Sequence, residues 1–149
     1  MSDPAPSAEA LAHHTIIVGF GLPGRHLAEY LAAQAKPFVV IEKNEITVRR
    51  CTLAGVPILT GNAGDSDVLT RAGIATASLV AIMLPDDATV LAVITQVRQI
   101  NPTVRIIARC NYTSSGLEAR SRGANEVVVA EQAVARELVS LLAETTSKD

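Results

Sequence analysis

Short apolar runs and longer amphipathic segments alternate along nearly the whole chain. The short runs are rich in Val and Ile and lack the polar alternation of a half-exposed strand, which is typical of parallel strands buried on both faces. Six runs are therefore predicted to be strands: Thr15–Val18, Phe38–Ile41, Pro57–Leu59, Leu79–Met83, Val104–Ala108 and Glu126–Val129.

The intervening segments show the period of helices that lay one side on a sheet. Glycine or proline follows several of them, as at helix ends. In the fourth segment Leu91 lies off the apolar stripe, and we expect it to face a partner. The predicted helices are Gly24–Ala35, Glu45–Ala54, Asp67–Ala72, Asp86–Ile100, Ser115–Arg122 and Glu131–Ala143.

This strict alternation predicts an α/β fold of the Rossmann type. The sheet is expected to be doubly wound and parallel, with six strands in the order 3-2-1-4-5-6 and helices on both faces. Residues 14–144 are assigned to this one nucleotide-binding domain, residues 1–13 to a flexible leader and residues 145–149 to a polar tail. His13 and His14, where the leader meets the domain, are expected to be solvated.

Composition and charge limit the possible partners and cellular location of the protein. The mean hydropathy is +0.28, yet no run approaches the roughly 20 apolar residues that span a bilayer, and the first residues lack the features of a signal peptide. The net charge of −2 gives no reason to expect a nucleic-acid partner. Cys51 and Cys110 are isolated, which favours a reduced, cytoplasmic protein.

The clearest motif is a GxGxxG loop, Gly19–Gly24, between the first strand and the first helix. Gly19 allows the tight turn, Gly21 lets the backbone approach a phosphate, and Gly24 lets the helix pack closely. Such a helix N-terminus binds phosphate through its free N–H groups. Pro23 lacks an N–H, so the expected donors are Phe20, Gly21, Leu22 and Gly24. The alternative is a merely tight strand-to-helix turn.

Glu42, at the end of the second strand, is the second element of a dinucleotide site. A carboxylate there accepts hydrogen bonds from ribose hydroxyls and repels a 2′-phosphate. The alternative is a solvated acid. Lys43 either balances the charge of the ligand or is simply exposed.

Two further loops follow strands at the same edge of the expected sheet, where ligands of open α/β folds bind. Asn62 and Ala63 follow the third strand, and the Asn62 amide suits the edge of an adenine. Leu84 and Pro85 follow the fourth strand and would wall the adenine or ribose. Asp86 is expected to cap the next helix.

No pattern for catalysis or metal binding accompanies these loops. The chain lacks a Walker A loop, HExxH, GxSxG and CxxC, and Tyr112 is followed four positions on by Gly116, not Lys. We therefore predict no catalytic residues and no metal, and a protein that is not an enzyme. A small NAD-dependent oxidoreductase is the alternative, and an adaptor with an empty glycine loop is a third, weaker hypothesis.

Together these segments resemble an RCK N-terminal domain, also called TrkA-N or KTN, and most closely the cytosolic domain of Kef-type cation:proton antiporters. The resemblance implies a regulatory domain of a potassium channel, transporter or antiporter, either a separate subunit or part of a longer chain. It also implies binding of AMP or NAD(H); Leu22 replaces the Arg that in the family often holds phosphates, which argues against triphosphates. The segments are Gly19–Gly24, Val39–Asn44, Gly61–Ala63, Leu69–Ile74, Pro85–Asp87, Ile107–Arg109 and Arg122–Val127.

A homodimer is expected from the last predicted helix. It carries more apolar side chains than one helix face can bury against a sheet. Exposed apolar surface usually marks an interface, most often a two-fold one. The alternative is that these side chains complete the core of a monomer. The residues concerned are Val134, Leu138, Val139, Leu141 and Leu142.

Overall fold

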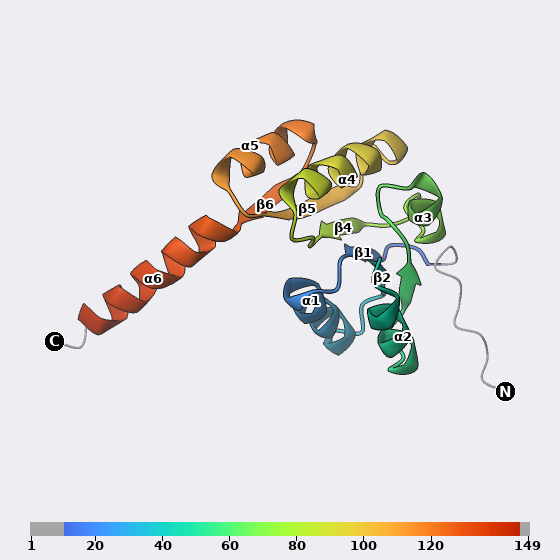
Figure 1. Cartoon of the computed structure of the whole chain (residues 1–149), viewed down its shortest axis with the longest axis horizontal. Helices are drawn as coiled ribbons and strands as arrows, with labels where there is room; N and C mark the ends of the chain where they lie inside the picture. The colour runs from blue at the N-terminus through green and yellow to red at the C-terminus, as the bar shows by residue number, and fades with distance from the viewer. Residues whose placement is uncertain (1–10, 147–149) are drawn as a thin grey trace.

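The computed structural model describes residues 11–146, which form one parallel sheet and six helices (Figure 1). Its strands lie in the order β3-β2-β1-β4-β5-β6, and every pair is parallel, which confirms the predicted Rossmann-type topology. The strands are β1 (Thr15–Val18), β2 (Phe38–Glu42), β3 (Ile58–Thr60), β4 (Leu79–Ile82), β5 (Arg105–Cys110) and β6 (Glu126–Val129). The helices are α1 (Leu22–Ala33), α2 (Glu45–Leu53), α3 (Ser66–Arg71), α4 (Asp87–Ile100), α5 (Thr113–Arg122) and α6 (Ala130–Thr146).

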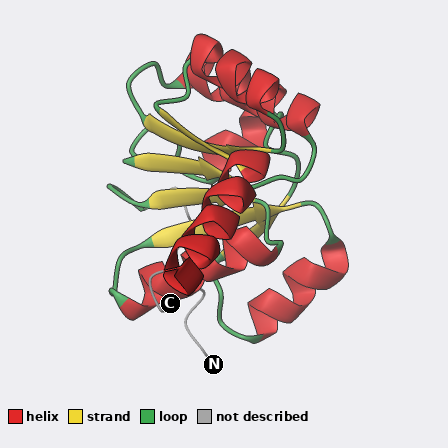
Figure 2. Cartoon of the chain, turned by 90° about the vertical axis from the view of Figure 1, so that its left-hand side faces the viewer, coloured by secondary structure: helices red, strands yellow, loops and turns green. Residues whose placement is uncertain are grey.

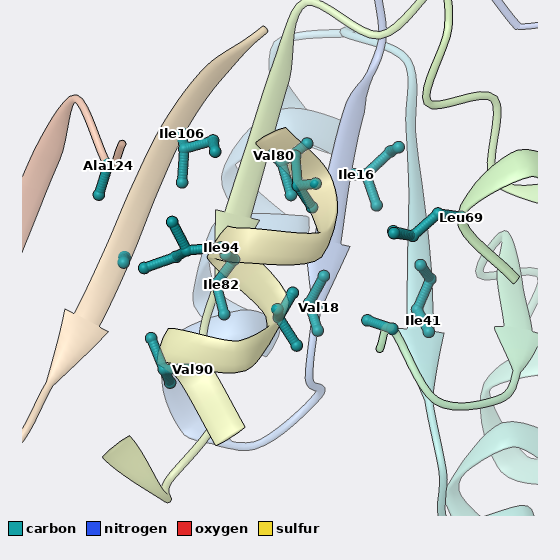
Figure 3. Close-up of a cluster of buried hydrophobic side chains, with 14 of the residues drawn as sticks. Ile16, Val18, Ile41, Leu69, Val80, Ile82, Val90, Ile94, Ile106 and Ala124 are labelled. Atoms are coloured by element: carbon teal, nitrogen blue, oxygen red, sulfur yellow. The ribbon is translucent and has the colours of Figure 1, made fainter. Parts of the chain in front are cut away.

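Helices lie on both faces of the sheet, as predicted (Figure 2). The larger core lies between the sheet and α3, α4 and α5, and it is built from Val, Ile, Leu and Ala side chains (Figure 3). On the other face, Ile17 of β1 and Val40 of β2 pack against Ala28 and Leu31 of α1. Burial of these apolar side chains is the main force that holds the layers together.

That second face is incompletely covered at β5 and β6. Ile106, Ala108 and Cys110 point into the larger core, so the alternate residue Ile107 points the opposite way, and it is only half-buried. Val128 of β6 is 49% exposed. The sheet therefore offers an apolar strip on the side of α1.

Helix α6 projects away from the domain instead of packing on it (Figure 1). None of its residues is buried, and the leucines and valines named above are between 51% and 68% exposed. Since a helix of 17 residues is about 25 Å long, the stripe extends well beyond the sheet. The alternative that these side chains complete the core of this chain is therefore wrong.

Short polar side chains cap the N-termini of α2, α3 and α4. Asn44 accepts hydrogen bonds from the N–H groups of Ile46 and Thr47 at the start of α2. Asp65 caps α3 and Asp86 caps α4 in the same manner, the latter as predicted. The predicted bounds of β1 and β6 agree with the observed ones, and the other predicted boundaries differ by at most three residues, as expected where caps and fraying decide the ends.

Two predictions about single residues were wrong. Leu91 does not face a partner: it is 8% exposed and belongs to the larger core, because the wide stripe of α4 packs under α3 and α5 as well as on the sheet. His14 is not solvated either. Its side chain is fully buried, and Nε2 donates to the Ala72 carbonyl at 2.8 Å.

The end of the predicted leader takes part in the domain. Leu11 packs against the larger core, and its carbonyl accepts a hydrogen bond from the Thr76 hydroxyl. The His13 N–H donates to the Thr76 carbonyl. Residues 1–10 of the predicted leader, and residues 147–149 of the predicted tail, lie outside the described residues.

Candidate functional site

The glycine loop connects β1 to α1 by a turn that needs its first and third glycines. Gly19 has a φ of +96°, a region that L side chains rarely adopt, and a Cβ there would lie 2.9 Å from the Met83 carbonyl oxygen. A Cβ on Gly24 would overlap the Gly19 carbonyl oxygen. These two glycines therefore bring the start of α1 against the loop and the end of β4.

Gly21 differs from the other two because nothing lies within 4 Å of where its Cβ would be. It is the N-cap of α1, with ordinary extended backbone angles and no side-chain cap. In the described part of the chain, the N–H groups of Gly21, Leu22 and Gly24 have no acceptor. Unpaired donors at an open helix N-terminus form the kind of cradle that binds phosphate.

The fourth expected donor is already engaged. The Phe20 N–H donates to Glu42 Oε2 at 2.8 Å, and the Asn44 N–H donates to Oε1 of the same carboxylate at 3.1 Å. Glu42 is thus held between the glycine loop and the start of α2. A carboxylate offers about four lone-pair positions, so both oxygens can still accept hydrogen bonds from a ligand.

A cavity of about 360 Å³ lies over the glycine loop, at the carboxyl ends of the strands. Five of the six loop residues line it, together with Glu42, Leu84 and Pro85; Gly24 does not. A smaller cavity of about 60 Å³ adjoins it and is lined by Lys43, Asn62 and Ala63. Glu42 and Leu84 line both cavities, and every residue expected from the sequence except Gly24 lines one or the other.

The Asn62 side chain is partly used within its own loop. Its Oδ1 accepts a hydrogen bond from the Gly64 N–H at 2.9 Å. The side-chain amide N–H groups of Asn62 remain free to donate to a ligand, and its oxygen has one further lone pair.

The loop after β4 is fixed by the residues that follow β5. Asn111 donates through its side-chain amide to the Pro85 carbonyl at 2.7 Å and to Asp87 at 3.1 Å. Burial raises the pKa of Asp87, but hydrogen bonds from Asn111, Ser115 and Tyr112 and the nearby charge of Arg109 outweigh it and lower that pKa overall. Asp87 is thus an ionised structural acceptor that holds the wall of the cavity.

Sequence reasoning missed two residues of the main cavity, Met83 and Arg109. Met83 directly follows β4, and Arg109 is the last residue but one of β5. The only sequence signal for either residue is its position next to a loop. Arg109 is two residues after Ile107, so both side chains lie on the same face of β5. The glycine loop lies on that face too.

Three further observations concern the rest of the described chain. A larger cavity, of about 630 Å³, lies at the amino-terminal edge of the sheet, but no Lys, Arg, Asp or Glu lines it. Across residues 11–146 there is no cluster of three or more His, Cys, Asp and Glu side chains suited to a metal ion. Nor does this part of the chain contain a helix with the length and apolar character to cross a membrane.

Comparisons with known proteins agree with the fold and the motifs. A family model described as TrkA-N domain matches residues 15–130. The putative cation/proton antiporter YbaL of Escherichia coli is 32% identical over 132 residues, or 89% of this chain. The putative K(+) efflux antiporter KefB of Alkalimonas amylolytica is 30% identical over 118 residues, or 79% of this chain. The chain spans only 24% of YbaL and 18% of KefB.

Solved structures show the same similarity. The crystal structure of the TrkA-N domain of YbaL superposes with a TM-score of 0.86 at 32% identity, covering 89% of this chain and 98% of that one. The GsuK channel bound to NAD superposes with a TM-score of 0.74 at 26% identity, covering 80% of this chain and 22% of that one. A further structure is described as GsuK bound to ADP, at 27% identity and a TM-score of 0.78, covering 93% of this chain and 36% of that one.

Proposed function

The chain belongs to the TrkA-N domain family, and from that premise we propose that it is a regulatory domain that binds AMP or NAD(H). Its target would be a membrane channel, transporter or antiporter for potassium or a related cation. The domain would act on the cytosolic side of the membrane, as a separate subunit or as part of a longer chain.

The observation that carries the binding proposal is the pairing of an open phosphate cradle with a fixed carboxylate. Three free N–H groups, of Gly21, Leu22 and Gly24, lie at the start of α1. Glu42 is held beside them by the Phe20 N–H. The cradle suits a phosphate and the carboxylate suits the two hydroxyls of an unmodified ribose.

The relatives support this choice of ligand and target. GsuK is described as bound to NAD and, in another structure, to ADP, and YbaL and KefB are described as antiporters of cations and K(+). Leu22 gives the loop no positive charge of its own, which favours ligands with one or two phosphates over triphosphates. We therefore expect AMP or NAD(H), and little binding of NADP(H).

A regulatory role is proposed over catalysis because the site presents nothing that would react. The residues around the cavity bind and orient; neither a nucleophile with a neighbouring base nor a proton donor poised over a nicotinamide position is found among the described lining residues. Incubation with NADH and a panel of carbonyl compounds tests this directly. Turnover above the background rate would establish the oxidoreductase alternative.

We propose further that the domain is a homodimer assembled through α6. The helix carries an unburied apolar stripe, and the strip of β5 and β6 around Ile107 and Val128 lacks a cover. Burying one such side chain contributes about 1.5–3 kcal/mol, and burial of the five on each helix is set against an association cost of roughly 4–15 kcal/mol. Nucleotide would regulate the target by favouring one arrangement of the two copies.

Light scattering at micromolar concentration tests the dimer. We expect twice the chain mass for the wild type, and a monomer for Leu138→Glu. Leu53→Glu is the matched control, since Leu53 is an exposed leucine on α2 and should leave the dimer intact. A monomeric wild type, with and without AMP or NADH, would refute the dimer and leave the nucleotide site untouched.

A further inference from the structure

The main cavity contains one cationic side chain among the described residues, and it does not come from the glycine loop. Arg109 enters from β5, near the end of the strand. Two other basic residues near the motif residues face elsewhere. Arg25, directly after the glycine loop, lines a separate groove between α1 and α2, and Lys43, directly after Glu42, lines the smaller cavity.

One hydrogen bond holds the Arg109 side chain in place, and most of its N–H donors remain free. Its Nη1 donates to the Leu84 carbonyl at 3.3 Å, a single bond that fixes the side chain along the cavity wall. Within residues 11–146 no carboxylate forms an ion pair with it. A guanidinium has five N–H donors, so most of them remain free to contact a ligand.

The neighbouring acids do not remove this capacity. Asp87 accepts hydrogen bonds from the Asn111 backbone and side chain and from the Tyr112 N–H. Glu42, across the cavity, accepts from Phe20 and Asn44. The cavity thus has a hydrogen-bonded acid on one side and an unpaired cation on the other, a match for a ligand with ribose hydroxyls at one end and a phosphate beyond them.

We propose that Arg109 recognises the charge of the phosphate at this site. Its guanidinium binds the 5′-phosphate group of the nucleotide from the side opposite to the free N–H groups of α1. It supplies from β5 the positive charge that Leu22 does not supply from the loop. Arginine suits this role because its planar fork can donate two parallel hydrogen bonds to phosphate oxygens. The proposal rests on the proposed nucleotide site and adds to it the residue that distinguishes a nucleotide from a nucleoside.

Titration calorimetry with AMP and with adenosine tests the proposal on the whole chain. For the wild type, AMP should bind at least tenfold more tightly than adenosine. Arg109→Gln should weaken AMP by about 10- to 100-fold, the range expected for charge-assisted hydrogen bonds, and should change adenosine by less than twofold. Arg109→Lys, which keeps the charge but not the fork, should lie between the two.

Arg105→Gln is the matched control, because Arg105 lies on the same strand but pairs with Glu126 at the surface. It should bind AMP as the wild type does. Circular dichroism and melting temperatures establish that each variant is folded, and the Lys variant keeps the comparison valid should the Gln variant unfold.

Three results would overturn the proposal. Equal losses for AMP and adenosine in Arg109→Gln would mean that Arg109 acts only through Glu42 or the cavity wall. A wild type that binds adenosine as tightly as AMP would mean that phosphate charge is not recognised, although an adenine site would still stand. Absence of binding of either ligand to the wild type would overturn the proposed nucleotide-binding function along with the role of Arg109.

Discussion

The role of Glu42 gives the sharpest quantitative prediction. In Glu42→Gln the side chain keeps its shape but loses its charge and one of its two acceptor oxygens. In the wild type the carboxylate accepts hydrogen bonds from the Phe20 N–H at 2.8 Å and from the Asn44 N–H at 3.1 Å. A glutamine can satisfy only one of these N–H groups, so the variant loses both local order and the charged acceptor for the ribose.

The size of the effect follows from these contacts. Hydrogen bonds to a charged acceptor contribute about 1.5–3 kcal/mol and neutral ones about 1 kcal/mol, so the loss on ribose binding is about 1–3 kcal/mol, or roughly 5- to 150-fold in Kd. A 2′-phosphate about 5 Å from the carboxylate would be repelled by about 3 kcal/mol per charge at an effective dielectric constant of about 20. The variant should therefore weaken AMP while relieving this repulsion.

Calorimetry with 5′-AMP and with adenosine 2′,5′-bisphosphate measures both effects. The wild type should prefer AMP by at least 100-fold, and Glu42→Gln should reduce this preference to below tenfold. Glu45→Gln, an exposed acid three residues on at the start of α2, changes the net charge equally and should preserve the preference. If the two ligands keep the same ratio of affinities in Glu42→Gln as in the wild type, then Glu42 does not face the ribose and the reasoning is refuted.

Three further predictions concern the loop, the acid side of the stability profile and the α6 contact. Gly21→Val should abolish AMP binding with an unchanged circular dichroism spectrum, because its side chain enters open space, whereas Gly24→Ala should lower the melting temperature; wild-type affinity in a folded Gly21→Val would place the ligand elsewhere. Asp87 has a lowered pKa in the folded state, so its stabilisation is full above its ordinary value of 3.8 and is lost as the pH falls through the lower folded value. The melting temperatures of wild type and Asp87→Asn should therefore differ at pH 6 and converge in strong acid, and a constant difference would contradict this. Added AMP or NADH should shift the melting temperature of the Leu138→Glu monomer too, since α6 lies outside the cavity; loss of the shift would mean that the site needs the dimer.

The sheet could be predicted because its strands carry their signal locally. Runs such as Ile16–Val18 and Val39–Ile41 are fully buried, and only parallel strands between two helical layers bury every residue of a run. Leu91 shows where local pattern fails: whether a residue beside the main stripe is buried depends on how neighbouring helices pack. His14 shows the same limit, because its burial depends on the Ala72 carbonyl, 58 positions away.

For the site as well, residues within a local motif could be predicted and residues placed by distant contacts could not. The glycine loop and Glu42 are recognised because backbone geometry and chemistry fix both the residue types and their spacing. The engagement of the Phe20 N–H by Glu42 and the entry of Arg109 join segments 22 residues or more apart, and no short motif encodes such a pairing. The local pattern of α6 likewise does not encode whether its apolar face packs on the sheet of the same chain.

The central claim is that an adenine nucleotide binds on the glycine loop, and amide resonances report this most directly. In a ¹⁵N–¹H correlation spectrum titrated with AMP, we predict saturable shifts of the Gly21, Leu22 and Gly24 amides, the three free donors of α1. The amide of Thr76, which lines the larger cavity at the opposite edge of the sheet, should stay in place. Unchanged loop amides at millimolar AMP, or shifts confined to the surroundings of Thr76, would contradict the claim.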